Sequence, residues 1–111
     1  MGGLSRGDLV VAAIAGDYGK PRPNVVVRAD GFAKLGSLTL LPLTSELYDL
    51  PPVRITVVPT AENGLKSTSQ IMIDKIATVT RTKIGQRIGR VDNAVMGRVD
   101  RALARFLGLE V

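Results

Sequence analysis

The sequence contains no cysteine and no histidine. Without cysteine the chain has no disulfide and no thiol nucleophile, and without histidine it lacks the usual general base of Ser-His-Asp and Cys-His catalysis. The side chains that most often hold zinc and iron are missing for the same reason. Any chemistry must come from arginine, lysine, hydroxyl and carboxylate side chains, and we expect neither a metal nor a cofactor.

Long apolar runs and aromatic residues are also scarce. The longest apolar run, 9–15, has seven residues, whereas a bilayer core needs roughly 20. Asp8 directly precedes this run and argues against a signal peptide, so we expect a cytoplasmic protein with no membrane association. Aromatic residues make up 4% of the chain and apolar residues 45%, which indicates a folded protein with an aliphatic core.

The chain has 111 residues, the common size of one domain, so we expect a single domain over 1–111. Its net charge of +5 is uneven, because residues 61–111 hold nine cations against five acids, while residues 1–60 hold six against five. The stretch 75–90 has five cations and no acid. Such a surface attracts polyanions such as nucleic acid, although a solvated basic face with no ligand would look the same.

Short β-branched and apolar segments, separated by glycine and proline, predict six strands. They are residues 8–15, 24–28, 37–43, 53–59, 69–73 and 76–80. The segment 16–23 is predicted to be a loop in which Pro21 and Pro23 hold Arg22 in an extended conformation. Pro42 suggests an edge strand or a bulge, and Asn63-Gly64 a hairpin turn. We expect 82–88 to be a loop or a short helix.

The period changes to that of a helix over about 92–107. The apolar positions of this segment are Val95, Val99, Ala102, Leu103, Phe106 and Leu107. Asp92 is the expected N-cap, Gly97 weakens the middle, and Gly108 is the expected stop. We expect the apolar stripe to pack on the strands rather than on a partner. The sequence thus predicts a mainly β fold, a small barrel closed by an amphipathic C-terminal helix.

Four blocks of sequence resemble the PemK/MazF family of toxin endoribonucleases. They are Arg-Gly-Asp-Leu-Val at 6–10, Pro-Arg-Pro at 21–23 leading into Val-Val-Val at 25–27, Leu-Pro-Leu-Thr at 41–44, and the apolar segment 71–79. The resemblance covers approximately residues 5–108. It implies an SH3-like barrel of the CcdB/MazF type, a homodimer, metal-independent cleavage of single-stranded RNA, and neutralisation by a cognate antitoxin.

The resemblance also implies roles for particular residues. Arg22 would be the catalytic arginine and Thr44 the catalytic hydroxyl residue, and Asp17 stands where several members have glutamate. The residues expected to bind RNA are Lys20, Ser45, Arg81, Lys83 and Arg87. Because Lys20-Pro21 replaces a longer loop, and Lys75 stands where some members have glutamine, the RNA sequence that relatives cleave cannot be transferred to this chain.

These residue types suit RNA cleavage by the substrate's own 2′-OH, which would leave 2′,3′-cyclic phosphate and 5′-OH ends. A guanidinium such as that of Arg22 is always charged and offers paired donors to a phosphate that gains negative charge. Thr44 would donate to a phosphate oxygen or orient the 2′-OH, and Asp17 is the candidate general base. Tyr48 would either stack on a base or pack against the protein.

Other interpretations remain open from the sequence. Each candidate catalytic residue also has an interpretation without a catalytic role: Arg22 as a surface arginine, Thr44 as a strand or turn residue, and Asp17 as a loop acid. A CcdB-like toxin that binds DNA gyrase and cleaves nothing would share the barrel, although it would not need the arginine and threonine together. A structural RNA-binding barrel would show salt-sensitive binding without cleavage products.

Overall fold

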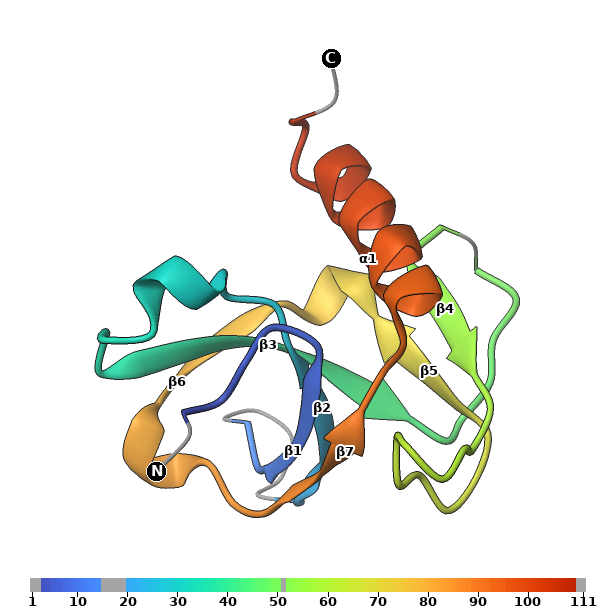
Figure 1. Cartoon of the computed structure of the whole chain (residues 1–111). Helices are drawn as coiled ribbons and strands as arrows, with labels where there is room; N and C mark the ends of the chain where they lie inside the picture. The colour runs from blue at the N-terminus through green and yellow to red at the C-terminus, as the bar shows by residue number, and fades with distance from the viewer. Residues whose placement is uncertain (1–2, 15–19, 51, 110–111) are drawn as a thin grey trace.

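In the computed structural model, which describes residues 3–14, 20–50 and 52–109, seven strands form one sheet that curls into a half-barrel (Figure 1). The strands are β1 (Asp8–Ala12), β2 (Arg22–Val26), β3 (Ser37–Thr44), β4 (Arg54–Val57), β5 (Ser69–Met72), β6 (Ala77–Thr80) and β7 (Arg87–Arg90). They lie in the order β4-β5-β3-β2-β1-β7, and β6 also pairs with β3. The predicted mainly β fold with a C-terminal helix is confirmed.

The long strand β3 is the centre of the sheet. One edge pairs with β2, while the other pairs with β6 up to Leu40 and with β5 from Leu43. Pro42 therefore lies in a central strand, and the prediction that it marks an edge or a bulge is wrong. It is tolerated because its missing N–H falls near the point where the neighbouring strand changes from β6 to β5.

Six of the strands overlap the six predicted segments, with ends that differ by a few residues. The exception is β7, which the sequence placed in a loop or short helix. Its residues Arg-Ile-Gly-Arg form a strand by pairing with β1, where Asp8 lies opposite Arg90 and Leu9 opposite Gly89. A segment with two arginines and a glycine has little strand propensity, so the distant partner determines its conformation.

Side chains on both faces of the central strands are buried. Leu9, Val25 and Leu41 belong to a large core cluster beneath the C-terminal helix, while their neighbours Val10, Val26 and Leu40 belong to a smaller cluster on the opposite face. Because successive side chains of a strand point to opposite faces, an apolar run can contribute to both clusters. This explains why β1 to β3 have continuous apolar sequences rather than alternating ones.

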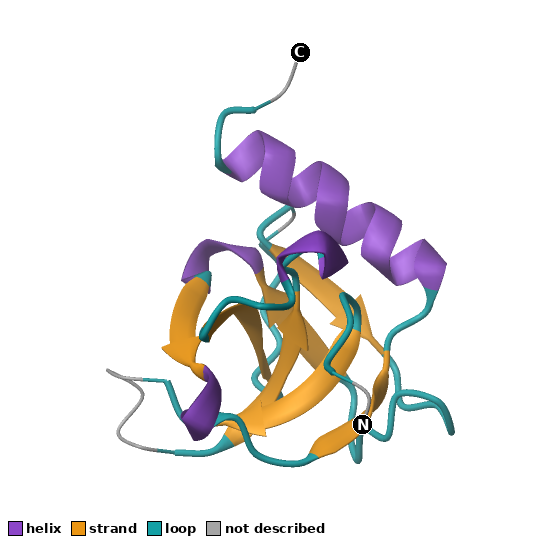
Figure 2. Cartoon of the chain, turned by 60° about the vertical axis from the view of Figure 1, so that its left-hand side comes forward, coloured by secondary structure: helices purple, strands orange, loops and turns teal. Residues whose placement is uncertain are grey.

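The helix α1 (Asn93–Phe106) packs across the sheet and contacts β4 and the 3-10 helix η2 (Ile73–Lys75), as Figure 2 shows. Asp92 caps it by accepting a 2.8 Å hydrogen bond from the backbone N–H of Val95. The buried residues of α1 are Met96, Val99, Ala102 and Leu103. Phe106 and Leu107 are 45% and 48% exposed, so the predicted apolar stripe does not pack over its whole length.

The connection between β4 and β5 runs from residue 58 to 68 instead of forming a tight hairpin at Asn63-Gly64. Its turn packs against β7, where the backbone N–H of Arg90 donates to the carbonyl of Glu62 at 2.9 Å. Gly64 has a φ of +69°, and a Cβ there would lie 2.1 Å from the carbonyl oxygen of Ile88. Gly64 is thus needed for a close backbone contact with β7.

Two further 3-10 helices, η1 (Asp30–Phe32) and η3 (Arg81–Lys83), lie in the connections from β2 to β3 and from β6 to β7. No helix in the parts of the chain that the structure describes has the length and apolar character needed to span a membrane.

Candidate active site

Arg22 is the first residue of β2 and lies opposite Ala12 of β1. Its side chain is half-buried, and its Nη1 donates to the carbonyl oxygen of Leu43 at 3.4 Å. The sequence placed Arg22 and Pro23 in a loop. The structure corrects this, because Pro23 pairs with Val11 and the strand already begins at Arg22. The extended conformation that the prolines predicted is present, but as a strand.

A buried asparagine lies beneath Arg22. The side chain of Asn24 is fully buried, and its Nδ2 donates to the carbonyl of Arg22 at 2.7 Å and to that of Ala12 at 3.2 Å. These two carbonyls belong to the residue pair at the end of the β1–β2 ladder. One amide therefore ties both strands together where Arg22 begins. Sequence reasoning missed this residue, although an amide next to a run of valines was a visible signal.

Thr44 is the last residue of β3 and lies close to Arg22. The pairing of β2 with β3 ends with Asn24 opposite Pro42, and two further residues along both strands would place Arg22 opposite Thr44. The hydrogen bond from Arg22 to the carbonyl of Leu43 agrees with this arrangement. The Oγ1 of Thr44 accepts from the backbone N–H of Glu46 at 3.1 Å. Arg22 and Thr44, two of the three predicted catalytic residues, are thus neighbours from different strands.

Arg22, Thr44 and Glu46 form a ridge between two clefts, since each of them lines both. The first cleft has a volume of about 730 Å³. Its cationic lining residues are Lys20, Arg22, Lys66 and Arg87, and its other polar residues include Ser45, Ser67 and Gln86. The structure thus gathers Lys20, Ser45 and Arg87, three of the predicted RNA-binding residues, beside Arg22. Sequence reasoning missed Lys66 and Gln86, because the fold rather than the spacing brings them there.

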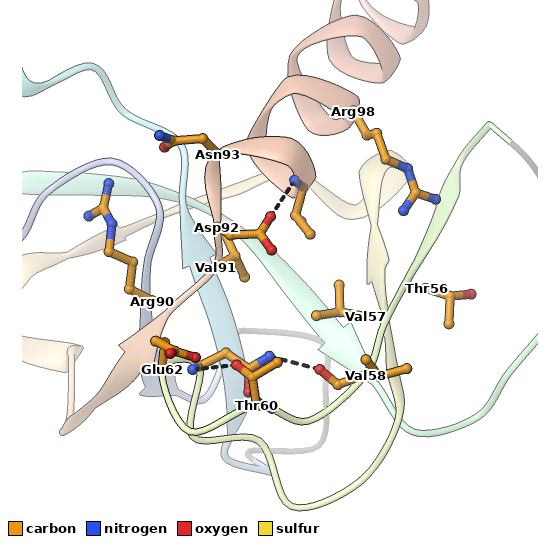
Figure 3. Close-up of a pocket in the computed structure, with 12 residues that line it drawn as sticks. Thr56, Val57, Val58, Thr60, Glu62, Arg90, Val91, Asp92, Asn93 and Arg98 are labelled. Carbon is orange, nitrogen blue, oxygen red and sulfur yellow. Dashed lines mark hydrogen bonds between the residues drawn. The ribbon is translucent and has the colours of Figure 1, made fainter.

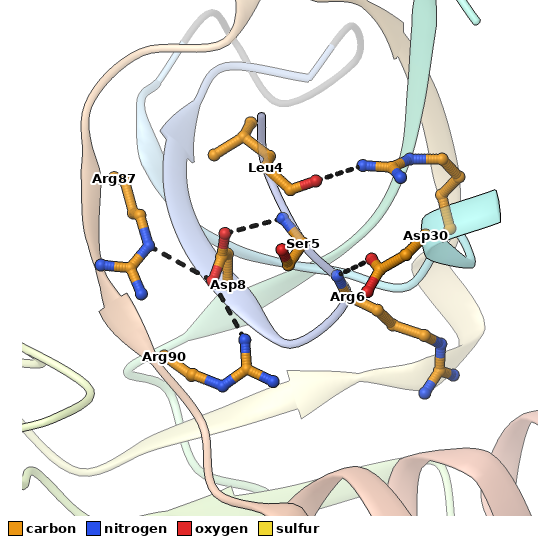
Figure 4. Close-up of polar contacts among 8 residues, drawn as sticks. Leu4, Ser5, Arg6, Asp8, Asp30, Arg87 and Arg90 are labelled. Atoms are coloured by element: carbon orange, nitrogen blue, oxygen red, sulfur yellow. Dashed lines mark hydrogen bonds and ion pairs between the residues drawn. The ribbon is translucent and has the colours of Figure 1, made fainter. Parts of the chain in front are cut away.

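Arg87 is held on the wall of the first cleft by Asp8. The carboxylate of Asp8 is almost fully buried, and its Oδ1 lies 3.2 Å from Nε of Arg87 and 3.3 Å from Nη1 of Arg90 (Figure 4). Its Oδ2 accepts from the backbone N–H of Ser5 at 2.8 Å. Because β1 pairs with β7, one buried acid can orient two arginines that lie about half exposed on the surface.

The second cleft, of about 570 Å³, lies on the other side of the ridge. Besides the ridge residues, it is lined by Ile14, Pro42, Tyr48, Met72, Asp74, Lys75, Ile76 and Ala77. Among the described residues that line it, Lys75 is the one cation besides Arg22, and Asp74 is paired with Arg54. The second cleft is therefore less basic than the first.

Two of the predicted site residues lie apart from this arrangement, and a third is not described. Arg81 and Lys83 belong to η3 and line neither cleft. Asp17 falls outside the residues that the structure describes. Glu46 is the carboxylate on the ridge, and sequence reasoning did not consider it for the site. Within the described residues, no three acidic side chains gather closely enough to hold a metal ion.

A further cleft lies elsewhere, between the start of α1, β4 and the turn at 60–63 (Figure 3). Its walls include Val57, Val58, Arg90 and Arg98, and the capping carboxylate of Asp92 faces its upper part. None of the predicted catalytic or RNA-binding residues lines it. The site that the sequence predicted is thus at the ridge and not in this cleft.

Comparison with known proteins places these residues in context. The family model of the PemK-like, MazF-like toxin of type II toxin-antitoxin systems matches residues 5–107. A relative from Mycolicibacterium smegmatis, called probable endoribonuclease MazF, is 43% identical over 107 residues, which are 96% of this chain and 98% of the relative. The ridge, both clefts and α1 all lie within the matched region.

Solved structures share the fold at lower identity. An endoribonuclease in complex with its cognate antitoxin from a mycobacterial species has a TM-score of 0.80 at 20% identity, over 97% of this chain and 98% of that chain. The Mycobacterium tuberculosis toxin MazF-mt6 also has a TM-score of 0.80, at 21% identity over 94% and 99% of the two chains. A MazE–MazF structure from Deinococcus radiodurans has a TM-score of 0.76 at 20% identity, over 98% and 100%. At these identities the likeness establishes the fold.

Proposed function

Because this chain belongs to the PemK-like, MazF-like toxins of type II toxin-antitoxin systems, we propose that it is an endoribonuclease that cleaves single-stranded RNA at the ridge. The single observation that carries this proposal is the meeting of Arg22 and Thr44 between two clefts, one of them lined by further cations. A strand of RNA lying across the ridge would bring a phosphate to these two side chains and extend into both clefts.

The chemistry that we propose uses the substrate's own nucleophile. The 2′-OH attacks the adjacent phosphorus, the 5′ oxygen leaves, and the products carry a 2′,3′-cyclic phosphate and a 5′-OH. The attack places extra negative charge on the phosphate oxygens. The guanidinium of Arg22 stabilises this charge, because it is permanently cationic and offers planar paired donors. Before the substrate arrives, its Nη1 already donates to the carbonyl of Leu43, and the side chain of Asn24 holds the backbone carbonyl of Arg22.

Thr44 and a carboxylate complete the proposed machinery. The bond from the N–H of Glu46 to Oγ1 of Thr44 uses an oxygen lone pair, so the hydroxyl proton can donate to a phosphate oxygen or to the 2′ oxygen. The general base is either Asp17 or Glu46. The position of Glu46 on the ridge supports Glu46 as the base. The place of Asp17 in the sequence motif supports Asp17. Separate substitution by asparagine and glutamine distinguishes the two.

The rest of the RNA backbone would lie along the first cleft. Lys20, Lys66 and Arg87 line it together with Ser45, and contacts from lysine and arginine to phosphates give affinity that falls with salt and carries little sequence information. Arg81 and Lys83 would contact RNA only beyond this cleft.

We also propose that the chain forms a homodimer and binds a cognate antitoxin. A structural relative has been solved in complex with its cognate antitoxin, and others as MazE–MazF. The net charge of +5 favours a partner with an acidic segment that also carries apolar residues.

The proposal is tested by incubating the purified protein with a long single-stranded RNA in excess chelator and mapping the product ends. We expect discrete cuts with 2′,3′-cyclic phosphate and 5′-OH ends, because the 2′-OH mechanism requires no metal. Products with 5′-phosphate ends, or cleavage that the chelator abolishes, would contradict the mechanism. RNA left intact, together with inhibition of gyrase supercoiling, would favour the CcdB-like alternative.

A further inference from the structure

The aromatic ring of Tyr48 stands exposed in the second cleft. The residue is 53% exposed, and it lines this cleft together with Arg22 and Thr44. It belongs to the segment after β3, which has no strand or helix of its own at this point. An exposed ring on such a segment would ordinarily lose much conformational freedom on binding a ligand.

The backbone of Tyr48 is, however, fixed by a buried side chain. The N–H of Tyr48 donates to Oε1 of Gln70 at 2.9 Å, and Nε2 of Gln70 donates back to the carbonyl of Tyr48 at 2.8 Å. Gln70 is only 6% exposed and lies opposite Thr44 in the pairing of β5 with β3. One amide thus ties the loop to the sheet beside a predicted catalytic residue.

The outer end of the ring is held as well. The hydroxyl of Tyr48 donates to Oε2 of Glu46 at 3.1 Å, and Glu46 is itself tied to Thr44 through its backbone. The ring is therefore restrained at both ends while its surface stays open to solvent. Restraint before binding lowers the entropy cost of an interaction, and an aromatic face is the group on which unpaired bases stack.

The two clefts differ in the part of a nucleotide that they suit. The first offers four cations for phosphates. The second offers the ring of Tyr48 with the apolar side chains of Met72 and Ile76. We infer that the second cleft is a nucleobase subsite in which Tyr48 stacks on a base next to the scissile phosphate, with Gln70 as the residue that positions Tyr48. This inference rests on the proposed function.

The test is a double-mutant cycle that combines a substitution in the protein with the removal of a base from the RNA. An RNA oligonucleotide spanning one mapped cut site is made in three forms: unmodified, and with an abasic ribonucleotide on either side of the scissile bond, which keeps the 2′-OH. We expect Tyr48→Ala to lower kcat/KM on the unmodified RNA by about fivefold to a hundredfold, the range of one base stacked on an aromatic ring. At one of the two positions, removal of the base should lower kcat/KM of the wild type by a similar factor. For Tyr48→Ala, removal of the same base should cause no further decrease in kcat/KM.

Two variants serve as controls for this cycle. Tyr48→Phe keeps the ring, so removal of the base should lower its kcat/KM as much as it lowers that of the wild type. Phe32→Ala removes another exposed aromatic ring, 61% exposed, which lines neither cleft, and should behave as the wild type does.

Gln70→Leu keeps the ring of Tyr48 but removes the amide that anchors its backbone. We expect the coupling between ring and base to become smaller, and thermal unfolding checks that the protein remains folded.

The possible outcomes separate this inference from the proposed function. Cleavage of unmodified RNA by the wild type tests the function alone. Suppose that the wild type cleaves, and that at both positions the decreases in kcat/KM from Tyr48→Ala and from the missing base are independent and multiply. Tyr48 then contacts neither base, and the inference is overturned. The same conclusion follows if Tyr48→Ala cleaves as fast as the wild type, as it would if the ring served only to bind another protein.

Discussion

At the scale of single residues, buried polar side chains hold the exposed residues of the proposed site. Asn24 holds the backbone of Arg22, Gln70 holds that of Tyr48, and Asp8 holds the side chain of Arg87. Each of the three is less than a tenth exposed. Buried polar groups with several hydrogen bonds have one preferred geometry, so these residues fix the exposed groups that we propose to meet RNA.

Substitution of Asp8 by asparagine tests this arrangement. The change removes the charge that orients Arg87, and we expect KM for RNA to rise while kcat changes less, since Arg22 and Thr44 are not touched. Loss of hydrogen bonds to charged groups should also lower the free energy of unfolding, on the order of 1–3 kcal/mol. Cleavage kinetics and thermal unfolding measure the two effects.

Asp100→Asn is the matched control, because the same chemical change falls on an exposed carboxylate that pairs with Arg6 at 2.5 Å. Exposed pairs contribute little to stability, so this variant should resemble the wild type in both measurements. An unchanged KM in Asp8→Asn would mean that Arg87 either needs no orientation or does not bind RNA.

The residues of the site could be predicted from the sequence only where a motif carried them. Arg22 and Thr44 came from the family resemblance, and the structure brings them together. Lys66 and Glu46 could not be predicted, because their places in the clefts depend on how the 58–68 connection and the segment after β3 lie on the sheet. Gln70 could not be predicted either, because its bonds to the backbone of Tyr48 join residues that are far apart in the sequence. The role of each site residue, Asp17 included, stays a prediction.

At the scale of elements, β7 and the turn before Gly64 lie close together, backbone against backbone. A Cβ on Gly89 would lie 2.3 Å from the carbonyl oxygen of Glu62 and 2.4 Å from the carbonyl carbon of Asn63. Both are backbone atoms and cannot move aside without moving the turn. This contact aligns β7, which carries Arg87 at its start, and therefore shapes the first cleft.

Gly89→Ala should lower the free energy of unfolding by on the order of 2 kcal/mol, because overpacking against backbone forces a shift. Gly97→Ala is the matched control: its nearest neighbour would be a side-chain atom of Arg101 at 3.5 Å, and alanine is favoured over glycine in a helix by up to about 1 kcal/mol. Chemical denaturation measures both. Equal stability of the two variants would contradict the close contact at β7.

The same contact shows where prediction of the elements reaches its limit. Local patterns were sufficient for α1 and its cap and for six strands, because their β-branched runs, helical spacing and Asp92 act within a few residues. The strand β7 and the long β4–β5 connection depend on pairing with distant parts of the chain. Pro42 misled for the same reason, since the change of partner from β6 to β5 is a property of the whole sheet.

At the scale of the whole molecule, the curled sheet gathers cations from distant segments. Lys20 precedes β2 and Arg22 begins it, Lys66 comes from the β4–β5 connection and Arg87 from β7, yet all four line one cleft. On the other side of the ridge, the second cleft has fewer cations and carries the exposed ring of Tyr48. This difference gives the ridge two distinct sides for a nucleotide chain.

The central claim is that Arg22 stabilises the charged phosphate during RNA cleavage. The most direct measurement is the cleavage rate at one mapped site for the wild type, Arg22→Ala and Arg22→Lys, in excess chelator. We expect Arg22→Ala to be slower by about 10²–10³-fold or more, as for other charge-stabilising donors, and Arg22→Lys to recover little because it lacks paired planar donors. Each variant should remain folded, with a loss of about 1 kcal/mol for the bond to Leu43. A folded Arg22→Ala protein that cleaves at the wild-type rate would contradict the account.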